Sequence, residues 1–352
     1  MTLADKKNIF TELGKFLNQF SESGSTKNPD VQYNDLFFSK FEDLIQLSQS
    51  HNGWYTPEQV YFAIQSWAAA LTKENLDQWL SAYDLKQHEP KKIGLILAGN
   101  IPLVGFHDFL SVLVTGNKVL VKTSSNDQHL LPFLAKYISA ISPEMNDYIT
   151  FVEGKLENFD AVIATGSNNT SRYFEYYFKD KPSIIRKSRN SVAVLNGNES
   201  KAQLTSLGED IFRYFGLGCR NVSKLFVPEG YCFNSFFEAM YEYQDIIKYE
   251  KYANNYDYNK AVFLMSNFKL LDNGFLTIKE DESHASPISS VFYEFYEDLE
   301  SLKTRLKADH GQIQCIVSKG IIEKSVPFGK TQRPELWDYA DNVDTIAFLK
   351  NI

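Results

Sequence analysis

The sequence predicts an α/β protein in which a helical N-terminal region precedes two doubly wound α/β domains. From residue 91 onward, short continuous apolar runs alternate with amphipathic segments, a pattern typical of parallel strands and their connecting helices. Before residue 89, apolar residues recur at helical spacing instead. A chain of 352 residues also has the length expected for two domains with substantial cores.

Residues 1–88 form the predicted helical region. One side of the first segment carries the apolar residues Ile9, Leu13, Phe16, Leu17 and Phe20. Another helix is expected to begin at Thr56-Pro57, because threonine caps helices and proline is favoured in their first turn. Residues 21–30 contain Gly24 and Pro29, which predict a polar loop.

The remaining elements follow from the apolar runs. Strands of the first sheet are expected at residues 93–98, 118–122, 150–153, 160–164, 184–185 and 192–195. Helices are expected at residues 102–114 and 130–141. A domain change is expected near residue 209, and the second sheet is expected to contain residues 225–227, 262–264, 288–295 and 313–317.

Composition and charge narrow the class of protein. The formal net charge is −8 and no long cluster of lysine and arginine is present, which argues against nucleic acid as the main partner. The three cysteines lack metal-ligand spacing, and their odd number is a poor disulfide framework. No apolar run approaches the roughly 20 residues of a membrane span, and the N-terminus lacks a signal-peptide core. We therefore expect a cytoplasmic protein with no metal site.

Cys219 is the candidate nucleophile. It follows a helical stretch and a Gly-Leu-Gly turn and precedes an apolar run, so it lies on a turn where a thiol can meet a substrate. An inert buried cysteine is the alternative, and we expect that role for Cys232 and Cys315. Upstream, Asn100 ends a strand-like run with a side-chain amide. Together they suggest thioester chemistry beside an oxyanion site.

Five segments resemble the aldehyde dehydrogenase superfamily, and within it the LuxC-type acyl-CoA reductases. The resemblance runs from about residue 91 to the C-terminus. Its segments are Gly99-Asn-Ile-Pro102, Gly116-Asn-Lys-Val-Leu-Val-Lys122, Ala164-Thr-Gly-Ser167, Gly216-Leu-Gly-Cys-Arg-Asn221 and Pro327-Phe-Gly-Lys-Thr-Gln-Arg-Pro-Glu-Leu-Trp-Asp-Tyr-Ala-Asp-Asn-Val-Asp344. It implies an aldehyde dehydrogenase-like fold, with a dinucleotide-binding domain in residues 1–208, to which residues 326–352 return. Residues 209–325 would be the catalytic domain.

The resemblance implies roles for two catalytic residues. Cys219 matches the catalytic cysteine, and Asn100 matches the asparagine whose amide holds the developing oxyanion with the cysteine backbone N–H. The alternative for Asn100 is an ordinary turn residue before Pro102. Arg220 and the neighbouring helix end are expected to favour the thiolate.

Four further residues match cofactor-binding positions. Lys122 matches a lysine that contacts the adenosine ribose, and Ser125 stands where many NAD-preferring relatives carry glutamate. Loss of that carboxylate removes its repulsion of a 2′-phosphate, so NADPH is the favoured cofactor, with NADH possible. Gly166 and Ser167 match a Gly-Ser pair placed against the dinucleotide, where a helix start offers backbone N–H groups. The alternatives are a solvated strand-end cation for Lys122 and a common helix cap for Ser167.

Two departures from the superfamily pattern stand out. Hydrolytic members use a glutamate to activate water, but the matching stretch, residues 186–191, carries two arginines and no carboxylate. An acyl-enzyme would then persist until a thiol or hydride attacks it. The second departure is Ser283, which stands where the superfamily usually has a glutamate that contacts the nicotinamide ribose. His284 beside it is expected to be an exposed loop histidine.

The expected function is NAD(P)H-dependent reduction of an acyl thioester, fatty acyl on CoA or a carrier protein, to an aldehyde. Aldehyde oxidation, with CoA or water as the acceptor, is one alternative. A cysteine acyltransferase or thioesterase without a dinucleotide is another, and a catalytically silent subunit is a third. A homo-oligomer and an acyl-transferring partner protein are the possible protein partners.

Overall fold

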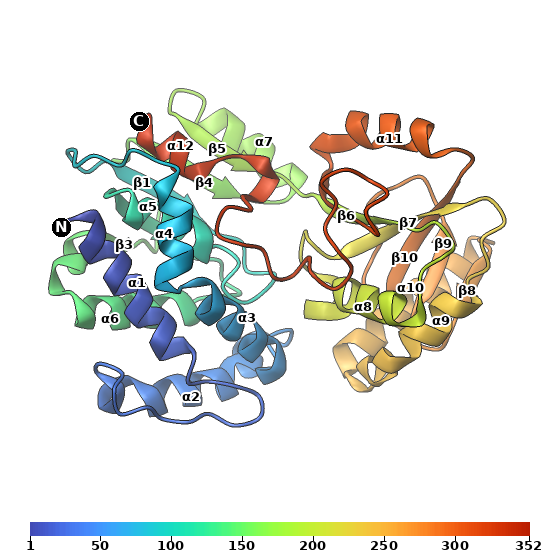
Figure 1. The fold of residues 1–352 in the computed structure, drawn as a ribbon, viewed down its shortest axis with the longest axis horizontal. Helices are drawn as coiled ribbons and strands as arrows, with labels where there is room; N and C mark the ends of the chain where they lie inside the picture. Colours follow the sequence, from blue (N-terminus) through green and yellow to red (C-terminus); the bar gives the residue numbers. More distant parts are fainter. The chain divides into compact units, whose positions relative to one another are not determined.

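The computed structural model describes residues 1–352, which divide into two compact units (Figure 1). The first unit contains residues Met1–Lys187 and Glu335–Ile352, and the second contains Ser188–Pro334. Each unit has its own sheet and its own apolar core. The fold class predicted from the sequence, α/β with two doubly wound domains and a helical N-terminal region, is confirmed.

The first unit is built on a five-stranded parallel sheet with the order β3-β2-β1-β4-β5. Its strands are β1 (Lys92–Ile96), β2 (Lys118–Lys122), β3 (Ile149–Phe151), β4 (Ala161–Thr165) and β5 (Ser183–Arg186). Ile93 of β1 lies opposite Val119 of β2 and Ala161 of β4, and all three are fully buried. Central strands buried on both faces explain the continuous apolar runs of the sequence.

The helices of the first unit fall into two groups. The N-terminal group is α1 (Leu3–Leu17), α2 (Asn34–His51), α3 (Pro57–Ala70) and α4 (Lys73–Ser81). The helices that alternate with strands or follow them are α5 (Phe106–Val114), α6 (Leu130–Ile141), the 3₁₀ turn η1 (Pro143–Asp147), α7 (Asn168–Tyr177), the 3₁₀ turn η5 (Ala340–Asn342) and α12 (Thr345–Lys350). Phe16 of α1 stacks on Tyr137 of α6, with ring centroids 4.1 Å apart, so the two groups share one core.

Helix α5 begins four residues later than the sequence indicated. The predicted start was Pro102, but Leu103 adopts φ = 57°, a left-handed conformation that a right-handed helix excludes. The helix therefore starts at Phe106, after Gly105. Residues 99–105 are left as a turn between β1 and α5, and Asn100 lies in that turn.

The second unit contains a six-stranded sheet with the order β11-β6-β7-β10-β9-β8. Its strands are β6 (Asn190–Val194), β7 (Val222–Pro228), β8 (Leu270–Asp272), β9 (Thr277–Glu280), β10 (Ser290–Tyr296) and β11 (Ile313–Ser318). All neighbouring pairs are parallel except β8 and β9. The helices are α8 (Lys201–Phe212), η2 (Arg213–Gly216), α9 (Asn234–Met240), η3 (Tyr241–Lys248), α10 (Glu250–Met265), α11 (Leu299–Ala308) and η4 (Asp309–Gly311).

The boundary between the units differs from the expected one. The sequence placed it at residues 208 and 209, with the return at 326, whereas the compact units meet at Lys187/Ser188 and Pro334/Glu335. Strand β6 causes the shift, because it pairs with β7 and β11 of the second sheet. The division of chemical roles between the units stays a prediction.

Residues 262–264 were predicted as a strand, and that prediction is wrong. They lie in α10, whose buried side chains are Tyr252, Tyr256, Asn259 and Phe263. This spacing of three and four residues is helical, and the three-residue apolar run was too short to distinguish a helix from a strand.

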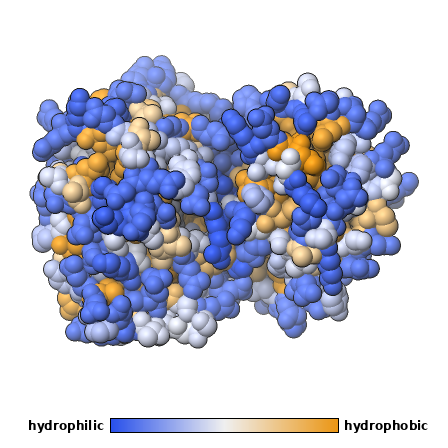
Figure 2. Space-filling model, viewed as in Figure 1, coloured by the Kyte–Doolittle hydropathy of each residue, from blue (hydrophilic) through white to orange (hydrophobic).

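Hydrophilic side chains predominate on the face of each unit that Figure 2 shows, with apolar residues in small groups between them. None of the helices combines the length and the apolar character that crossing a bilayer requires.

Candidate active site

In the first unit, the predicted Asn100 and cofactor residues all follow the carboxyl ends of parallel strands. Asn100 follows β1, Ser125 follows β2, and Gly166 and Ser167 follow β4, while Lys122 is the last residue of β2. Strand β1 lies between β2 and β4, so the chain reverses its direction across the sheet at this point. Open α/β sheets bind ligands in the crevice at such a switch point. The topology thus brings all five residues to one edge of the sheet.

The turns after β1 and β2 are held against each other. A Cβ on Gly99 would lie 2.7 Å from the Ser124 side chain, so only glycine permits this approach. The Asn52 amide donates to the carbonyl of Asn126 at 3.2 Å and approaches that of Gly99 at 3.5 Å. Asn52 therefore ties the two turns together from outside the sheet.

The turn that carries Asn100 has further anchors. The Tyr55 hydroxyl donates to the carbonyl of Ile101 at 2.9 Å. The backbone N–H of Leu103 approaches the Asp127 carboxylate at 3.4 Å. Burial raises the pKa of Asp127 to about 6. Asn100 itself is half-buried, which suits a side chain that presents one end to a ligand.

Lys122 and Ser125 differ in their environment. The Lys122 ammonium donates to the carbonyl of Gly154 at 2.9 Å, so it is held near the end of β3. Ser125 is exposed in the turn after β2. A ribose contact for either residue stays a prediction.

Gly166 and Ser167 form the start of α7. The Ser167 hydroxyl accepts from the backbone N–H of Thr170 at 3.2 Å, so it caps the helix as its alternative interpretation proposed. A Cβ on Gly166 would lie 3.0 Å from both Thr170 and Phe174. The start of α7 therefore explains why glycine and serine occupy these two positions. Their contact with a dinucleotide stays a prediction.

In the second unit, Cys219 lies on the turn between η2 and β7 and is exposed. The alternative of an inert buried cysteine therefore does not apply to it. Cys315 is buried as expected, whereas Cys232 is exposed, and the expectation that it is buried is wrong. Cys232 comes after the end of β7, where the chain has left the sheet.

The backbone before Cys219 is unusual. Tyr214, Phe215 and Gly216 have φ values of 53°, 57° and 78°, so three consecutive residues are left-handed. This conformation costs roughly 1–2 kcal/mol for each residue with a side chain. Burial of both aromatic side chains offsets that cost, and the Phe215 ring stacks on Tyr249 at 4.6 Å.

Asn221 holds the turn in place, a role that sequence reasoning missed. Its amide Nδ2 donates to the carbonyls of Arg213 at 2.8 Å, Asp210 at 3.1 Å and Ile211 at 3.3 Å. Its Oδ1 accepts from the Gly218 backbone at 2.8 Å. One buried side chain therefore joins the end of α8 to the residue before Cys219.

The Cys219 carbonyl is fixed from the other side. The buried Ser191 hydroxyl donates to it at 3.0 Å and accepts from the backbone N–H of Cys315 at 3.1 Å. The Arg220 guanidinium lies 3.4 Å from the Cys315 sulfur. The turn is thus linked to both β6 and β11.

Residues 186–191, the stretch that lacks the glutamate of hydrolytic relatives, contain two arginines with partners in the structure. Arg186 forms a bidentate ion pair with Asp108, with N–O distances of 2.6 and 3.2 Å. Arg189 donates to the carbonyls of His310 at 2.9 Å and Ile313 at 3.4 Å. Both arginines of this stretch thus have structural partners, and its match to the glutamate of hydrolytic relatives stays a prediction.

His284 is buried, and the expectation of an exposed loop histidine is wrong. Its Nε2 lies 3.0 Å from the Asp309 carboxylate, and its carbonyl accepts from the Ser223 hydroxyl at 2.6 Å. The polar loop before β10 is thereby attached to two other elements, namely β7 and the end of α11.

The two units together have the fold of the aldehyde dehydrogenases. A Bacillus cereus aldehyde dehydrogenase in complex with NAD⁺ superposes with a TM-score of 0.61 over 90% of this chain and 72% of its own, at 14% identity. A Sinorhizobium meliloti NAD-dependent aldehyde dehydrogenase gives 0.63 over 90% and 70%, at 13% identity. An Anabaena variabilis putative aldehyde dehydrogenase, PutA, gives 0.61 over 93% and 79%, at 16% identity.

Within this fold class, the chain belongs to the acyl-CoA reductase (LuxC) family, whose pattern matches residues 50–242, more than half of its length. A long-chain acyl-protein thioester reductase of Aliivibrio fischeri is 23% identical over 231 residues, which is 59% of this chain. The chain spans about half, 47%, of the length of that relative. The matched residues 50–242 include all six predicted site residues.

Proposed function

We propose that this protein reduces an acyl thioester to an aldehyde through a cysteine acyl-enzyme. The observation that carries the proposal is the exposed Cys219 on a turn that Asn221 and Ser191 hold, in a chain of the acyl-CoA reductase family. A fixed, accessible thiol is what nucleophilic catalysis on a carbonyl requires. A fatty acyl group on CoA or on a carrier protein is the proposed substrate.

The first stage transfers the acyl group to the enzyme. The Cys219 thiolate attacks the thioester carbonyl and forms a new carbon–sulfur bond. The bond between the acyl carbon and the carrier sulfur breaks, and the carrier leaves as a thiolate that takes a proton. Asn100 is proposed to stabilise the oxyanion with the backbone N–H of Cys219, and such donors contribute about 3 kcal/mol to a transition state. The product of this stage is a thioester on Cys219.

The second stage needs a reductant, and the first unit suits a nicotinamide dinucleotide. Gly99 and Gly166 sit where a Cβ would crowd its neighbours, and the capped N-terminus of α7 offers N–H groups at the switch point. Lys122, Ser125, Gly166 and Ser167 are the proposed contacts, with NADPH preferred over NADH because Ser125 lacks a carboxylate. A bound nicotinamide dinucleotide would supply the hydride that the acyl carbon needs. Cys219 would then leave as a thiolate when its bond to that carbon breaks, so that aldehyde is released and the sulfur takes a proton from solvent.

The stretch with two arginines supports reduction over hydrolysis. Residues 186–191 contain no carboxylate to activate water, and both arginines already hold carbonyls or Asp108. The acyl group is therefore proposed to wait for hydride. The same site run in reverse would oxidise an aldehyde with CoA, whereas water alone would not serve as acceptor. A dinucleotide-free acyltransferase or thioesterase would form the same adduct but would not consume NADPH.

Intact-protein mass spectrometry tests the first stage. Exposure to acyl-CoA without reductant is expected to add one acyl group to wild type and none to Cys219→Ala. Cys232→Ala is the matched control, because Cys232 is the other exposed cysteine, and it should acylate like wild type. Adding NADPH, or NADH in a parallel arm, should then remove the adduct and release aldehyde. Aldehyde production by Cys219→Ala would overturn the proposal.

We also propose that the protein acts in the cytoplasm and that a homo-oligomer is its possible assembly. The relative named for acyl-protein reduction also suggests that a partner protein delivers the acyl group here.

A further inference from the structure

A cavity lies at the opposite end of the first sheet from the candidate cofactor residues. It has a volume of about 120 Å³. Its lining includes Pro90, Gly116 and Tyr148, which come just before β1, β2 and β3 respectively. Because parallel strands all run one way, these residues mark the amino ends of the sheet, whereas Asn100 and Ser125 follow the carboxyl ends. The cavity is therefore separate from the candidate dinucleotide site.

The charge of the lining is one-sided. The lining includes Lys6, His88 and Lys86 but no aspartate or glutamate. Lys86 is exposed and pairs with Asp84 at 3.1 Å, so Lys6 is the buried cation of the lining. The chain as a whole has 44 acidic residues against 36 lysines and arginines, so this is a local reversal of charge. The carboxylates that act on Lys6 have other partners: Asp5 accepts from the backbone and hydroxyl of Thr2. Glu144 pairs with the amino group of Met1 at 3.3 Å.

Lys6 is the key side chain of this cavity. Only 9% of it is exposed, and its ammonium makes one contact, with the carbonyl of Val114 at 3.5 Å, the limit of a hydrogen bond. An ammonium has three N–H donors, so most of its bonding capacity is unused by protein groups. Burial accordingly lowers the pKa of Lys6.

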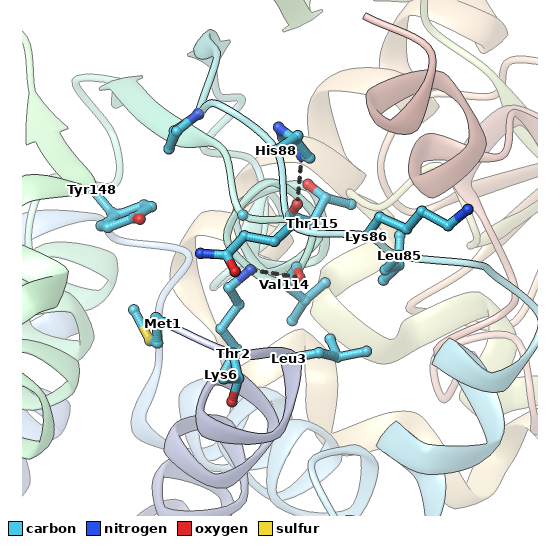
Figure 3. Close-up of a pocket in the computed structure, with 13 residues that line it drawn as sticks. Met1, Thr2, Leu3, Lys6, Leu85, Lys86, His88, Val114, Thr115 and Tyr148 are labelled. Carbon is cyan, nitrogen blue, oxygen red and sulfur yellow. Dashed lines mark hydrogen bonds between the residues drawn. The ribbon is translucent and has the colours of Figure 1, made fainter.

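Of the carbonyls at the end of α5, that of Val114 is the one that contacts Lys6. His88 already binds the carbonyl of Thr115 at 3.0 Å, and Figure 3 shows Lys6 and His88 reaching the end of α5 from below and above in that view. A Cβ on Gly116 would lie 2.7 Å from the Lys6 nitrogen and 4.0 Å from Nε2 of His88. Glycine at this position leaves open the point on which both groups converge.

We propose that this cavity binds a small oxyanion, of the size of inorganic phosphate or a short carboxylate, with Lys6 as its charged partner. Gln87 and Tyr148 line the same cavity and bring an amide and a phenol as neutral donors. Charge-assisted hydrogen bonds to the anion would use the donors that the protein leaves unmet. The site adds an anion-binding activity that is independent of thioester chemistry.

Calorimetric titration with inorganic phosphate, with butanoate and with chloride at equal ionic strength tests the site. Lys6→Met keeps the length of the side chain and removes the charge, and it should weaken binding at least about tenfold. Lys15→Met on the same helix and Lys122→Met at the candidate cofactor site should bind as wild type does. Tyr148→Phe removes one donor and should weaken binding by a few fold, which provides a second test if Lys6→Met folds poorly.

The outcomes separate the possible ligands. Binding of phosphate alone supports a phosphate-type ligand, and binding of butanoate, alone or with phosphate, supports a carboxylate. The proposal would be overturned if neither phosphate nor butanoate binds. Unchanged affinity in both Lys6→Met and Tyr148→Phe would overturn it too, because the anion would then bind elsewhere.

Discussion

The backbone before Cys219 depends on one buried amide, that of Asn221. Asn221 satisfies three carbonyls at the end of α8 and the N–H of Gly218. These groups flank the left-handed segment 214–216. Those carbonyls have lost the helical partners they would otherwise have. Asn221 thus replaces a missing turn of helix and keeps the candidate nucleophile on a fixed backbone.

Asn221→Ala is expected to lower the free energy of unfolding by about 2 kcal/mol, because it leaves buried polar groups without partners. It should also slow acylation of Cys219, since the turn loses its fixed geometry. Denaturant unfolding and the rate of acyl-adduct formation measure the two effects. Asn255→Ala, which removes one hydrogen bond within α10, should change neither by a comparable amount. Equal unfolding midpoints for the two variants would contradict the role given to Asn221.

At this scale, the sequence identified the thiol but not its support. Glycines around Cys219 predicted a turn, and the turn is present with the thiol exposed. The role of Asn221 depends on where the carbonyls of residues 210–213 point. That direction follows from left-handed Tyr214 and Phe215, a conformation rare for aromatic residues and without a sequence signal.

Between elements, Asp210 joins α8 to the segment that follows β11. Its carboxylate accepts from the backbone N–H groups of Gly329 at 2.6 Å and Thr331 at 3.0 Å, and from the Thr331 hydroxyl at 2.8 Å. The side chain is fully buried, and burial raises its pKa to about 6 in spite of these donors. The desolvation of this carboxylate therefore outweighs its hydrogen bonds.

A pH dependence follows from Asp210. The unfolded pKa of an aspartate is about 3.9, so between pH 4 and about 6 the native state binds the proton that the unfolded chain has released. The contribution of Asp210 to the free energy of unfolding should then fall as pH rises through this window. Denaturant unfolding at several pH values should show a weaker decline in Asp210→Asn than in wild type. Parallel pH profiles for the two proteins would refute this prediction.

The elements themselves were predictable where packing demanded a continuous apolar run. Residues 118–122 and 130–141 form the expected strand and helix. The failures have local causes, namely a left-handed Leu103 that delays α5 and a short run at 262–264 inside a helix. Membership of β6 in the second sheet was not predictable, because a buried strand carries no mark of its partner strands.

For the whole molecule, the unit boundaries make a prediction about independent folding. A fragment of residues 188–334 contains one complete sheet and its core, so it should fold alone and unfold cooperatively. A fragment of residues 209–325, the boundaries expected from the sequence, lacks β6, most of α8 and the partners of Asp210. It should not fold. Circular dichroism during denaturant titration compares the two fragments, and equal cooperativity would contradict the observed boundary.

The return of the last residues to the first unit has a consequence for synthesis on the ribosome. Arg186 donates to the carbonyl of Ala340 and to the hydroxyl of Thr345, and Ile346 and Leu349 are buried in the core of that unit. The second unit is therefore complete as soon as residue 334 has emerged, while the first unit, although translated earlier, still waits for its final helix. The nascent chain should thus finish its later-made unit first, and its earlier-made unit only after residues 335–352 have emerged.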